Sequence, residues 1–585
     1  MDVPHNLEEI YSNIRSESVR YLEKHYGAIK VNPEDTNKYP VTLKVRVSVV
    51  EHELNLLVSL PFNFPDSFPK VKLDEQSFQK VYPLPHLSMS KTLCLFDEVA
   101  ASPNPEQPIG VLEATIKKCK EILSKGILKQ NLNDYSDEFE TYWAENSRGF
   151  YLSIVKPSGT SKEVYLAPFK YQNWLEKGIF ADKKSDAINW VHNLGGIINE
   201  EEITKVLYIP LKEPIKYPFP KNNKEIYNLL KENKCNLKSL TNFLSKNKRP
   251  TKVLFSMEDD SQYSWGVWEH SKPYKEIVSK YKGRRRIQTG IKGFRANKQH
   301  GLLEIIKEFP MVELNKYSVE DVSAIRLKTR GGDGKVENIE NKVAIVGCGA
   351  VGSQIAQGIF DIGIQDLLLI DNDILSFENI NRHLCGADHV GELKTEAVKS
   401  KLSKHYPTSN IDVYNENVLS VLMENPDALN SYDLIIVAIS NTPTELRINE
   451  LQRENIIKKP ILNIWVEPYL AGGHAIWNEP NNSVPLNILF NNEGLYKYQI
   501  LKDGNVYSKR ELGCYTSYVP YGVLELKKFI VEVMFFIQQQ LVYEDNKSRI
   551  FTWIGNLTEQ RKKKRLLATK WVGATDFSSR IQEIE

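Results

Sequence analysis

The stretch Val343-Ala344-Ile345-Val346-Gly347-Cys348-Gly349-Ala350-Val351-Gly352 decides how the C-terminal part of the chain folds. Its four leading apolar residues predict a buried strand, and Gly347, Gly349 and Gly352 predict a tight turn into a helix. Such a turn lets the backbone approach a phosphate, and the helix N-terminus directs amide groups toward it. Asp371 ends the next predicted strand, where a carboxylate can bind ribose hydroxyls. The sequence therefore predicts a nucleotide-binding site.

Further apolar runs indicate the sheet that carries this site. Continuous apolar segments occur at residues 342–346, 366–371, 432–439 and 460–466. Runs of this kind are typical of strands that are covered on both faces of a parallel sheet. We expect residues 331–585 to form an α/β domain.

The glycine motif and Asp371 alone would also fit an NAD-linked dehydrogenase. The residues after Asp371 indicate which class of nucleotide-binding protein this is. They read Asn372-Asp373-Ile374-Leu375-Ser376-Phe377-Glu378-Asn379-Ile380-Asn381-Arg382, and then Gly391-Glu392-Leu393-Lys394. Over about residues 340–480 the chain resembles the Rossmann-like, ThiF-type adenylating domain of ubiquitin-activating enzymes and of sulfur-carrier adenylyltransferases in thiamine and molybdopterin synthesis. The resemblance implies that ATP binds here, with Asp371 on the ribose, Asn379 and Arg382 on the phosphates, and Lys394 on the triphosphate.

The reaction of that family requires positive charge. A C-terminal glycine carboxylate attacks the α-phosphate of ATP, so cations and oriented amides must neutralise the charge that develops. Arg382 and Lys394 are the candidate catalytic cations. The resemblance also implies a homodimer, in which Arg326 is a candidate for an arginine that reaches into the partner's ATP site.

The expected magnesium ligand is absent from its usual place. The family usually has an aspartate just after the strand that here ends at Ile439, and this sequence has Ser440-Asn441. Magnesium needs few protein ligands when phosphates and water complete its octahedron. Asp373 is therefore the candidate Mg²⁺ ligand, and a degenerate site that binds nucleotide without turnover is the alternative.

Two cysteines are candidate nucleophiles in the C-terminal domain. Cys514 follows Lys509 and Arg510, and the resemblance implies that it accepts the adenylated glycine as a thioester. A nearby cation favours the reactive thiolate form. Cys385, close to the nucleotide motif in the sequence, is the second choice.

The N-terminal residues 1–145 predict an α+β domain. Residues 6–26 have helical apolar spacing, residues 41–49 alternate apolar and polar side chains, and residues 54–60 form a second apolar strand. A proline-rich turn at residues 61–69 and a helix with Leu112, Ile116, Cys119 and Leu123 on one face follow.

This domain resembles a ubiquitin-conjugating fold through its order of elements and through residues 85–97, Pro-His-Leu-Ser-Met-Ser-Lys-Thr-Leu-Cys-Leu-Phe-Asp. The resemblance implies that His86 matches the histidine of the His-Pro-Asn motif and that Cys94 is the acyl-accepting thiol. No asparagine follows His86, so a donor to the thioester has to come from a backbone amide or from Ser88 or Ser90.

Composition limits the remaining possibilities. A formal net charge of +2, with 26% charged and 41% hydrophobic residues, is that of an ordinary globular protein and predicts no nucleic-acid partner. We expect no membrane segment and no secretory signal, and hence a cytoplasmic location. The six cysteines form no CxxC pair, which argues against a disulfide framework. Residues 146–330 show no chemical signature and are predicted to be an α/β linker or recruitment domain.

The order of the domains resembles the fused activating and conjugating enzymes of bacterial CBASS anti-phage operons. That resemblance implies that the C-terminal glycine of a cGAS/DncV-like nucleotidyltransferase is activated with ATP, bound to Cys514, transferred to Cys94 and joined to a target lysine. Two alternatives stay open: a sulfur-carrier or peptide adenylyltransferase without conjugation, and a non-catalytic nucleotide-binding scaffold.

Overall fold

The computed structural model describes residues 7–97, 100–145, 147–172, 174–246, 251–259, 262–270, 313–331, 340–502, 504–510, 517–543 and 545–584. The chain divides into two compact units. The first consists of Met1–Val164 with Lys205–Asp321, and the second of Tyr165–Thr204 with Val322–Glu585. Each unit is described by itself.

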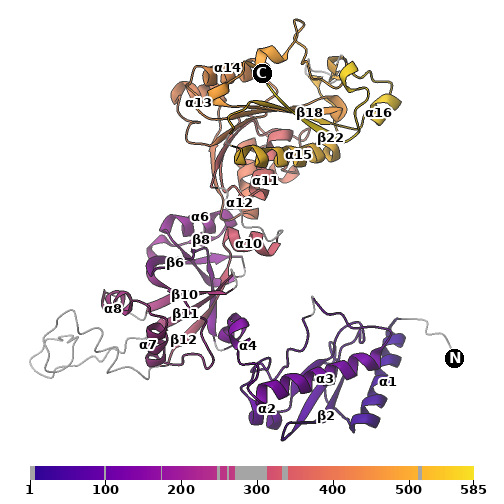
Figure 1. The fold of residues 1–585 in the computed structure, drawn as a ribbon, viewed down its shortest axis with the longest axis vertical. Coiled ribbons are helices and arrows are strands. Elements are labelled where there is room, and N and C mark those ends of the chain that lie inside the picture. Colours follow the sequence, from indigo (N-terminus) through magenta and orange to yellow (C-terminus); the bar gives the residue numbers. More distant parts are fainter. Residues whose placement is uncertain are drawn as a thin grey trace, which may run out of the picture. The chain divides into compact units, whose positions relative to one another are not determined.

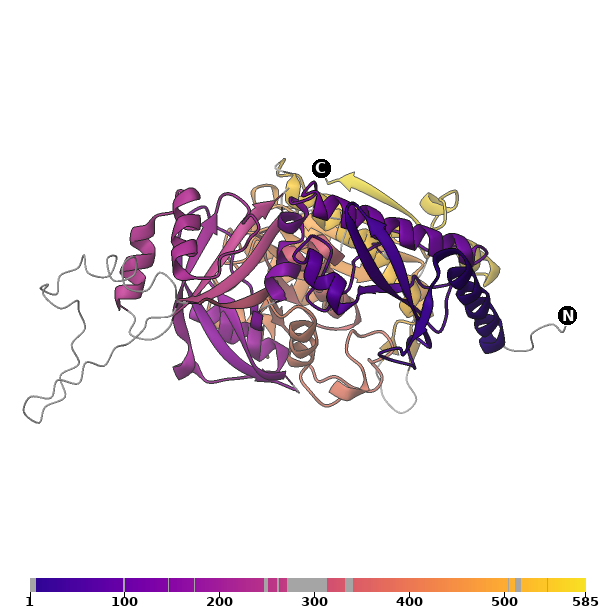
Figure 2. The same ribbon diagram turned by 90° about the horizontal axis from the view of Figure 1, so that it is seen from below.

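The N-terminal part of the first unit is a four-stranded antiparallel meander with helices beside it (Figures 1 and 2). From Leu43 to Val49 the alternation buries every second side chain, as predicted, and Val41 pairs with Leu60 at one end of the central hairpin. Leu112, Ile116, Cys119 and Leu123 form the buried face of the long helix α3. The elements are α1 (Leu7–Tyr26), β1 (Ile29–Val31), β2 (Val41–Val49), β3 (His52–Leu60), β4 (Lys70–Leu73), α2 (Glu75–Val81) and α3 (Pro108–Ile127).

The rest of the first unit is a second sheet with an aromatic core. Its strands are neighbours in the order β5-β12-β11-β10-β9, and Trp143, Phe255 and Trp268 are buried against them. The elements are α4 (Asp134–Asp137), α5 (Phe139–Ala144), β5 (Ser147–Ser153), β9 (Thr204–Leu211), α7 (Asn223–Glu232), α8 (Leu237–Lys246), β10 (Thr251–Asp259), β11 (Gln262–His270) and β12 (Asn315–Asp321). Thr204, the first residue of β9, belongs to the second unit, and residues 162–164, the start of β6 (Lys162–Tyr171), belong to the first.

The second unit contains the predicted parallel sheet. β13 lies between β14 and β16, and the strands β15-β14-β13-β16-β17 run parallel. The sheet continues through three antiparallel strands, β18, β21 and β22, which the apolar-run pattern did not predict. Their sequences include glycine, histidine and asparagine, as in Gly472–Asn478, although every residue of that strand is buried.

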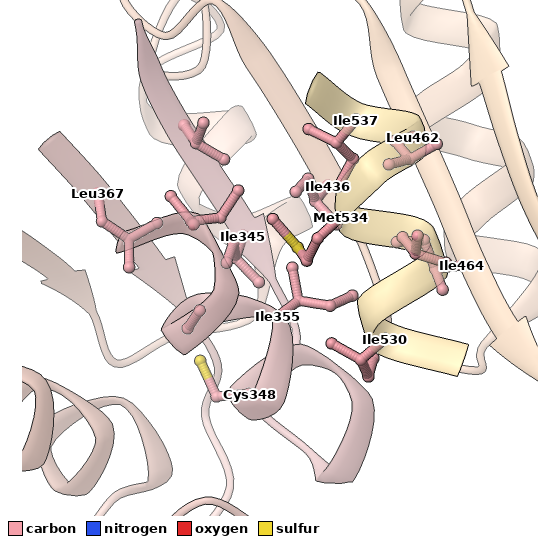
Figure 3. Packing of buried hydrophobic residues seen from close by; sticks show 14 of the residues in the cluster. Ile345, Cys348, Ile355, Leu367, Ile436, Leu462, Ile464, Ile530, Met534 and Ile537 are labelled. Atoms are coloured by element: carbon pink, nitrogen blue, oxygen red, sulfur yellow. The ribbon is translucent and has the colours of Figure 1, made fainter. Parts of the chain in front are cut away.

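The helices of the second unit enclose this mixed sheet. Ile530, Met534 and Ile537 of α15 pack on Ile355 of α11 and on the strands below it (Figure 3). The first part of the unit comprises β6 (Lys162–Tyr171), β7 (Trp174–Ala181), α6 (Lys184–Leu194), β8 (Ile197–Ile198), α10 (Ala324–Gly331), β13 (Lys342–Val346), α11 (Ala350–Asp361), β14 (Asp366–Ile370), α12 (Lys394–His405), β15 (Asn410–Tyr414), α13 (Val418–Glu424) and β16 (Leu434–Val437). It continues with α14 (Thr442–Arg453), β17 (Ile461–Val466), β18 (Gly472–Asn478), β19 (Lys509–Arg510), β20 (Ser517–Tyr518), α15 (Val523–Val542), β21 (Arg549–Ile554), α16 (Leu557–Lys562) and β22 (Ser578–Glu583).

Among the helices that the structure describes, none is long and apolar enough to cross a lipid bilayer.

Candidate active sites

A cavity of about 340 Å³ lies at the carboxyl ends of β13, β14 and β16. Gly347 turns the chain out of β13 with φ +94°, and a Cβ atom there would lie 2.6 Å from the carbonyl oxygen of Ala438. Gly352 packs so closely on the turn that a Cβ would lie 1.8 Å from the Gly347 carbonyl oxygen. Gly349 caps α11 and has open space around it. The three glycines thus form the predicted strand-turn-helix, and Gly347 and Gly349 line the cavity.

Asp371 is fixed at the edge of this cavity by backbone amides. Its carboxylate accepts hydrogen bonds from the amides of Cys348, at 2.6 Å, and Asp373, at 2.8 Å. This arrangement ties the glycine loop to the end of β14 and directs a carboxylate into the cavity, where the resemblance places a ribose.

Lys394 reaches the same cavity from the start of α12. Residues 373–375 pair with residues 391–394, and the backbone amide of Lys394 donates to the Asp373 carbonyl at 2.9 Å. The Lys394 ammonium then lies 2.7 Å from the Asp373 carboxylate, with the lysine side chain 11% exposed and the aspartate 64% exposed. Both residues line the cavity, which therefore has a cation and a carboxylate in its wall.

Asn379 and Arg382 lie near the glycine loop but do not line the cavity. The Asn379 side chain accepts hydrogen bonds from the amide and hydroxyl of Ser376. Arg382 donates to the carbonyl of Val519 at 3.1 Å, and its guanidinium lies 4.4 Å from the ring centre of Tyr521. Tyr521 itself lines the cavity, a feature that no sequence pattern indicated.

The position of the missing aspartate is part of the cavity wall. Ser440 has φ +51°, and Asn441 caps α14 by accepting a hydrogen bond from the Thr444 amide. Glu445, one turn into α14, is half-buried beneath this loop, and burial raises the pKa of its carboxyl group to about 7, against the opposing effect of the Asn441 and Ser440 amides. Among the described residues, no group of three or more His, Cys, Asp or Glu side chains is arranged to hold a metal ion.

Cys514 lies outside the described residues, as do all residues from 511 to 516. On either side of them Lys509 pairs with Tyr518 and Arg510 pairs with Ser517. Val519, which binds Arg382, is only five residues beyond Cys514, a span of at most roughly 18 Å of extended chain.

The second-choice nucleophile in this domain is unsuited to the role. Cys385 is completely buried, and burial raises the pKa of its thiol to about 12. Cys348, inside the glycine loop, is also completely buried, and burial raises the pKa of that thiol well above its usual value. Both thiols therefore resist conversion to the reactive thiolate.

Cys94 forms a second site, in the first unit. It is exposed, and its amide donates to the carbonyl of His86 at 2.9 Å. The His86 side chain hydrogen-bonds Cys94 and lies between Asp134, at 2.9 Å, and Glu138, at 3.2 Å. These two carboxylates follow the motif by about 40 to 50 residues, and sequence reasoning missed them.

The two serines proposed from the sequence as donors have other partners. Ser88 Oγ and Ser90 Oγ lie 2.7 Å apart, and each contacts Thr92. His86 therefore has the better position for acting on Cys94.

Comparison with known protein families agrees with both sites. Residues 323–467 match the ThiF family, and residues 22–151 match prokaryotic E2 family B. The first match spans the nucleotide cavity from Gly347 to Ser440, and the second spans His86, Cys94, Asp134 and Glu138.

Individual relatives are similar over part of the chain. Ubiquitin-like modifier-activating enzyme 5 of Caenorhabditis elegans is 28% identical over 189 residues, which are 30% of this chain and 42% of that protein. The ATP-dependent ubiquitin transferase-like protein Cap2 of Escherichia coli is 28% identical over 145 residues, 24% of each chain. The solved structure of E. coli MccB has 17% identity and a TM-score of 0.27, covering 42% of this chain and 64% of that one. The chain thus spans less than half the length of these two curated relatives.

The glycine loop with Asp371 and Lys394, and the exposed Cys94 beside His86, fall inside the two family matches. The chain therefore combines an E1-like adenylation domain of the ThiF family with an E2-like domain of prokaryotic E2 family B.

Proposed function

We propose that the protein activates the C-terminal glycine of a partner protein with ATP and conjugates it to a lysine. The observation that carries this proposal is the presence in one chain of two complementary sites. One has a glycine loop, the Asp371 carboxylate and a lysine around a cavity, and the other has an exposed cysteine beside a histidine. An adenylating site together with an acyl-accepting thiol supports a sequence in which an acyl group is first activated and then transferred; neither site alone would support both steps.

The first step is adenylation in the cavity between Gly347 and Lys394. The glycine-loop amides and Lys394 bind the phosphates of ATP, Asp371 binds the ribose, and Arg382 and Asn379 complete the phosphate contacts once the substrates are bound. The glycine carboxylate attacks the α-phosphate and pyrophosphate leaves, which requires that positive charge offset the charge on the phosphates.

Asp373 fits the proposed magnesium ion because its carboxylate lines the cavity and is mostly exposed. A hydrated Mg²⁺ ion there would supply charge to the triphosphate with one carboxylate ligand from this chain. The ion pair between Asp373 and Lys394 has to break when the Lys394 ammonium binds a phosphate group of ATP.

The second and third steps transfer the acyl group. Cys514 displaces AMP to form a thioester, Cys94 takes the acyl group from Cys514, and a lysine amine takes it from Cys94. The short chain distance between Cys514 and Val519, which contacts Arg382, supports a thiol close to the adenylate. The exposure of Cys94 supports access by another thiol and by an amine.

A homodimer is part of this proposal. The side chains of Leu327 in α10, Val531 and Phe535 in α15, and Ile581 in β22 are 47–64% exposed around one groove of the second unit. Arg326 lies beside Leu327 in α10. If a second copy of the chain binds at this groove, Arg326 of each copy would lie at the edge of the dimer interface. The occupant we propose is a second copy of this chain.

The order of the two domains suggests the class of substrate. We propose a cGAS/DncV-like nucleotidyltransferase ending in glycine as the conjugated protein, an anti-phage role of the CBASS type and a cytoplasmic location. The domain limits at residues 145 and 330, and recruitment of the substrate by the middle domain, also stay predictions.

The test is a non-reducing gel with intact-mass analysis after mixing the purified protein with Mg-ATP and a candidate glycine-ended protein. Wild type, Cys514→Ala and Cys94→Ala are compared. We expect a thiol-sensitive adduct in wild type and Cys94→Ala, none in Cys514→Ala, and final conjugates in wild type alone. Conjugates at the wild-type level from Cys94→Ala would favour an adenylyltransferase without conjugation, and no pyrophosphate release with any acceptor would favour a scaffold.

A further inference from the structure

Four titratable side chains meet at the second site: Cys94, His86, Asp134 and Glu138. His86 Nε2 lies 2.9 Å from Asp134 Oδ2, and His86 Nδ1 lies 3.2 Å from Glu138 Oε1. The histidine side chain also hydrogen-bonds Cys94. The side chains of His86, Asp134 and Glu138 are 22–36% exposed, so the cluster is at the surface but partly shielded from water.

The contacts of His86 indicate its charge. A neutral imidazole has one N–H donor, whereas an imidazolium has two. Ionised carboxylates only accept hydrogen bonds, and one faces each ring nitrogen of His86. Both nitrogens therefore carry protons when both acids are ionised, and His86 is a cation in contact with Cys94.

Other contacts fix this arrangement. The backbone of His86 has φ +62°, its amide donates to the hydroxyl of Tyr142 at 2.6 Å, and its carbonyl accepts from the amide of Cys94. Asp134 is held in turn by the side-chain amide of Asn131 at 2.9 Å. The imidazole ring is thus held in place by hydrogen bonds to the His86 backbone and by the carboxylates that face its two ring nitrogens.

Directions of pKa shifts agree with this geometry. Hydrogen bonds to Cys94 and Glu138 raise the pKa of His86 to about 10, against the opposing effect of burial. The hydrogen bond to His86 holds the pKa of the Glu138 carboxyl below its usual value.

We propose that Asp134 and Glu138 are positioning residues that hold His86 as an imidazolium, and that His86 stabilises the oxyanion formed when an amine attacks the Cys94 thioester. Three acceptors, namely the two carboxylates and the Cys94 sulfur, share the two N–H groups of His86. Acylation of Cys94 converts its thiol to a thioester, so an N–H of His86 that faced the sulfur becomes available to the acyl oxygen. His86 thus replaces the asparagine that is missing from the motif, and the inference rests on the proposed role of Cys94.

The step balances without another reactant. The lysine ammonium loses two protons to water, and its nitrogen forms a bond to the carbonyl carbon. The carbon–sulfur bond then breaks, and Cys94 leaves as a thiolate beside the imidazolium. The charge of His86 opposes negative charge first on oxygen and then on sulfur, and this is the electrostatic contribution that lowers such barriers.

The kinetic test separates loading of Cys94 from its discharge. Cys94 is loaded through Cys514 with Mg-ATP and the glycine-ended partner, ATP is removed, and free lysine is added at pH 7.5. We expect Glu138→Gln and Asp134→Asn to load but to discharge at least about tenfold more slowly than wild type. The control is Asp137→Asn, an exposed carboxylate on the same helix α4, which should discharge like wild type.

Outcomes at the two stages have different meanings. No loading of wild-type Cys94 would overturn the proposed relay and this inference with it. Normal loading followed by wild-type discharge in both acid variants would overturn this inference and leave the relay standing.

A second measurement reads the charge of His86 directly in the wild-type protein. In ¹⁵N-histidine-labelled wild type at pH 7.5, the two ring nitrogens of His86 should both show shifts of protonated nitrogen, and in Glu138→Gln the titration of His86 should move toward its ordinary pKa of about 6.5. A neutral His86 ring in the wild-type spectrum would overturn the inference.

Discussion

The guanidinium of Arg382 lies 4.4 Å from the ring centre of Tyr521, and Arg382 Nη1 donates to the carbonyl of Val519 at 3.1 Å. Arg382 belongs to the motif that is proposed to bind phosphates, whereas Val519 and Tyr521 follow Cys514 closely in the chain. These contacts connect the segment that carries the proposed thioester cysteine to the proposed ATP site. We therefore expect a change in the contacts of Arg382 to affect both the proposed ATP site and the segment that carries Cys514.

Tyr521→Ala is expected to slow adenylation, because Arg382 loses the ring that orients it. A cation–π contact contributes about 0.5–2 kcal/mol, so kcat/KM for ATP–pyrophosphate exchange should fall by about 2- to 30-fold. Tyr521→Phe keeps the ring and should stay close to wild type. Tyr518→Ala, an exposed tyrosine of the same segment, is the control, and an equal loss in that variant would contradict a specific role for Tyr521.

Alanine substitutions at Gly347 and Gly349 should affect different properties: the first the stability of the free protein, and the second the binding of nucleotide. Gly347→Ala places a Cβ 2.6 Å from the Ala438 carbonyl at φ +94°, so the free protein should lose at least about 1–3 kcal/mol of stability. Gly349→Ala has open space and a negative φ, so its free protein should unfold like wild type. Because Gly349 lines the cavity, an added methyl group should hinder the approach of phosphates, and Gly349→Ala should lose the increase in unfolding temperature that Mg-ATP gives wild type.

That experiment has a clear contrary result. A full Mg-ATP shift in Gly349→Ala would mean that phosphates do not approach this loop.

Glu445 predicts a pH dependence of stability. Burial raises the pKa of its carboxyl group to about 7 in the folded protein, whereas an unfolded glutamate ionises near 4.3. The folded state thus favours the protonated form, so this contribution is complete below about pH 4.3 and is lost as pH rises to about 7. Relative to Glu445→Gln, wild type should lose up to about 3 kcal/mol of unfolding free energy between pH 4.5 and pH 8. Denaturant unfolding of both proteins measures this, and a constant difference would refute it.

The sequence predicted elements whose signal is local. The alternation along residues 41–49 reflects one buried face, and the glycine loop depends on a strand, a turn and a helix that are consecutive in the chain. Both appear in the structure as predicted. In contrast, β18 is buried along its whole length although it contains Gly472, Gly473, His474 and Asn478. Side chains from distant segments cover it, such as Ile500 beside Gly472 and Phe529 of α15 beside Gly473.

The parts of the sites that sequence reasoning missed are long-range contacts. Asp134 and Glu138 meet His86 from about 50 residues away, and Tyr521 meets Arg382 from about 140 residues away. Nothing in the local pattern of an exposed aspartate or a tyrosine distinguishes these residues from surface side chains. Only the fold brings them to the motifs.

The groove of the second unit is the proposed interface of the homodimer. Phe535→Asp puts a charge on a side chain that is 64% exposed in the groove, and it should convert a dimer into a monomer in light scattering after gel filtration. Leu524→Asp lies on the same helix, is 69% exposed and does not line the groove, so it should leave the dimer intact. Equal masses for wild type and Phe535→Asp would place the interface elsewhere or show that none forms.

Mixing two inactive variants tests whether Arg326 acts on the partner's site. Arg326→Ala removes the donated arginine, and Lys394→Ala removes a cation from the subunit's own cavity. In a mixed dimer, one ATP site has both an intact Lys394 and an intact Arg326 from the partner, while the other site lacks both. Pyrophosphate exchange should therefore rise well above the sum of the separate variants once subunits exchange. If Arg326 instead served its own subunit, neither site of the mixed dimer would be complete and activity would stay at that sum.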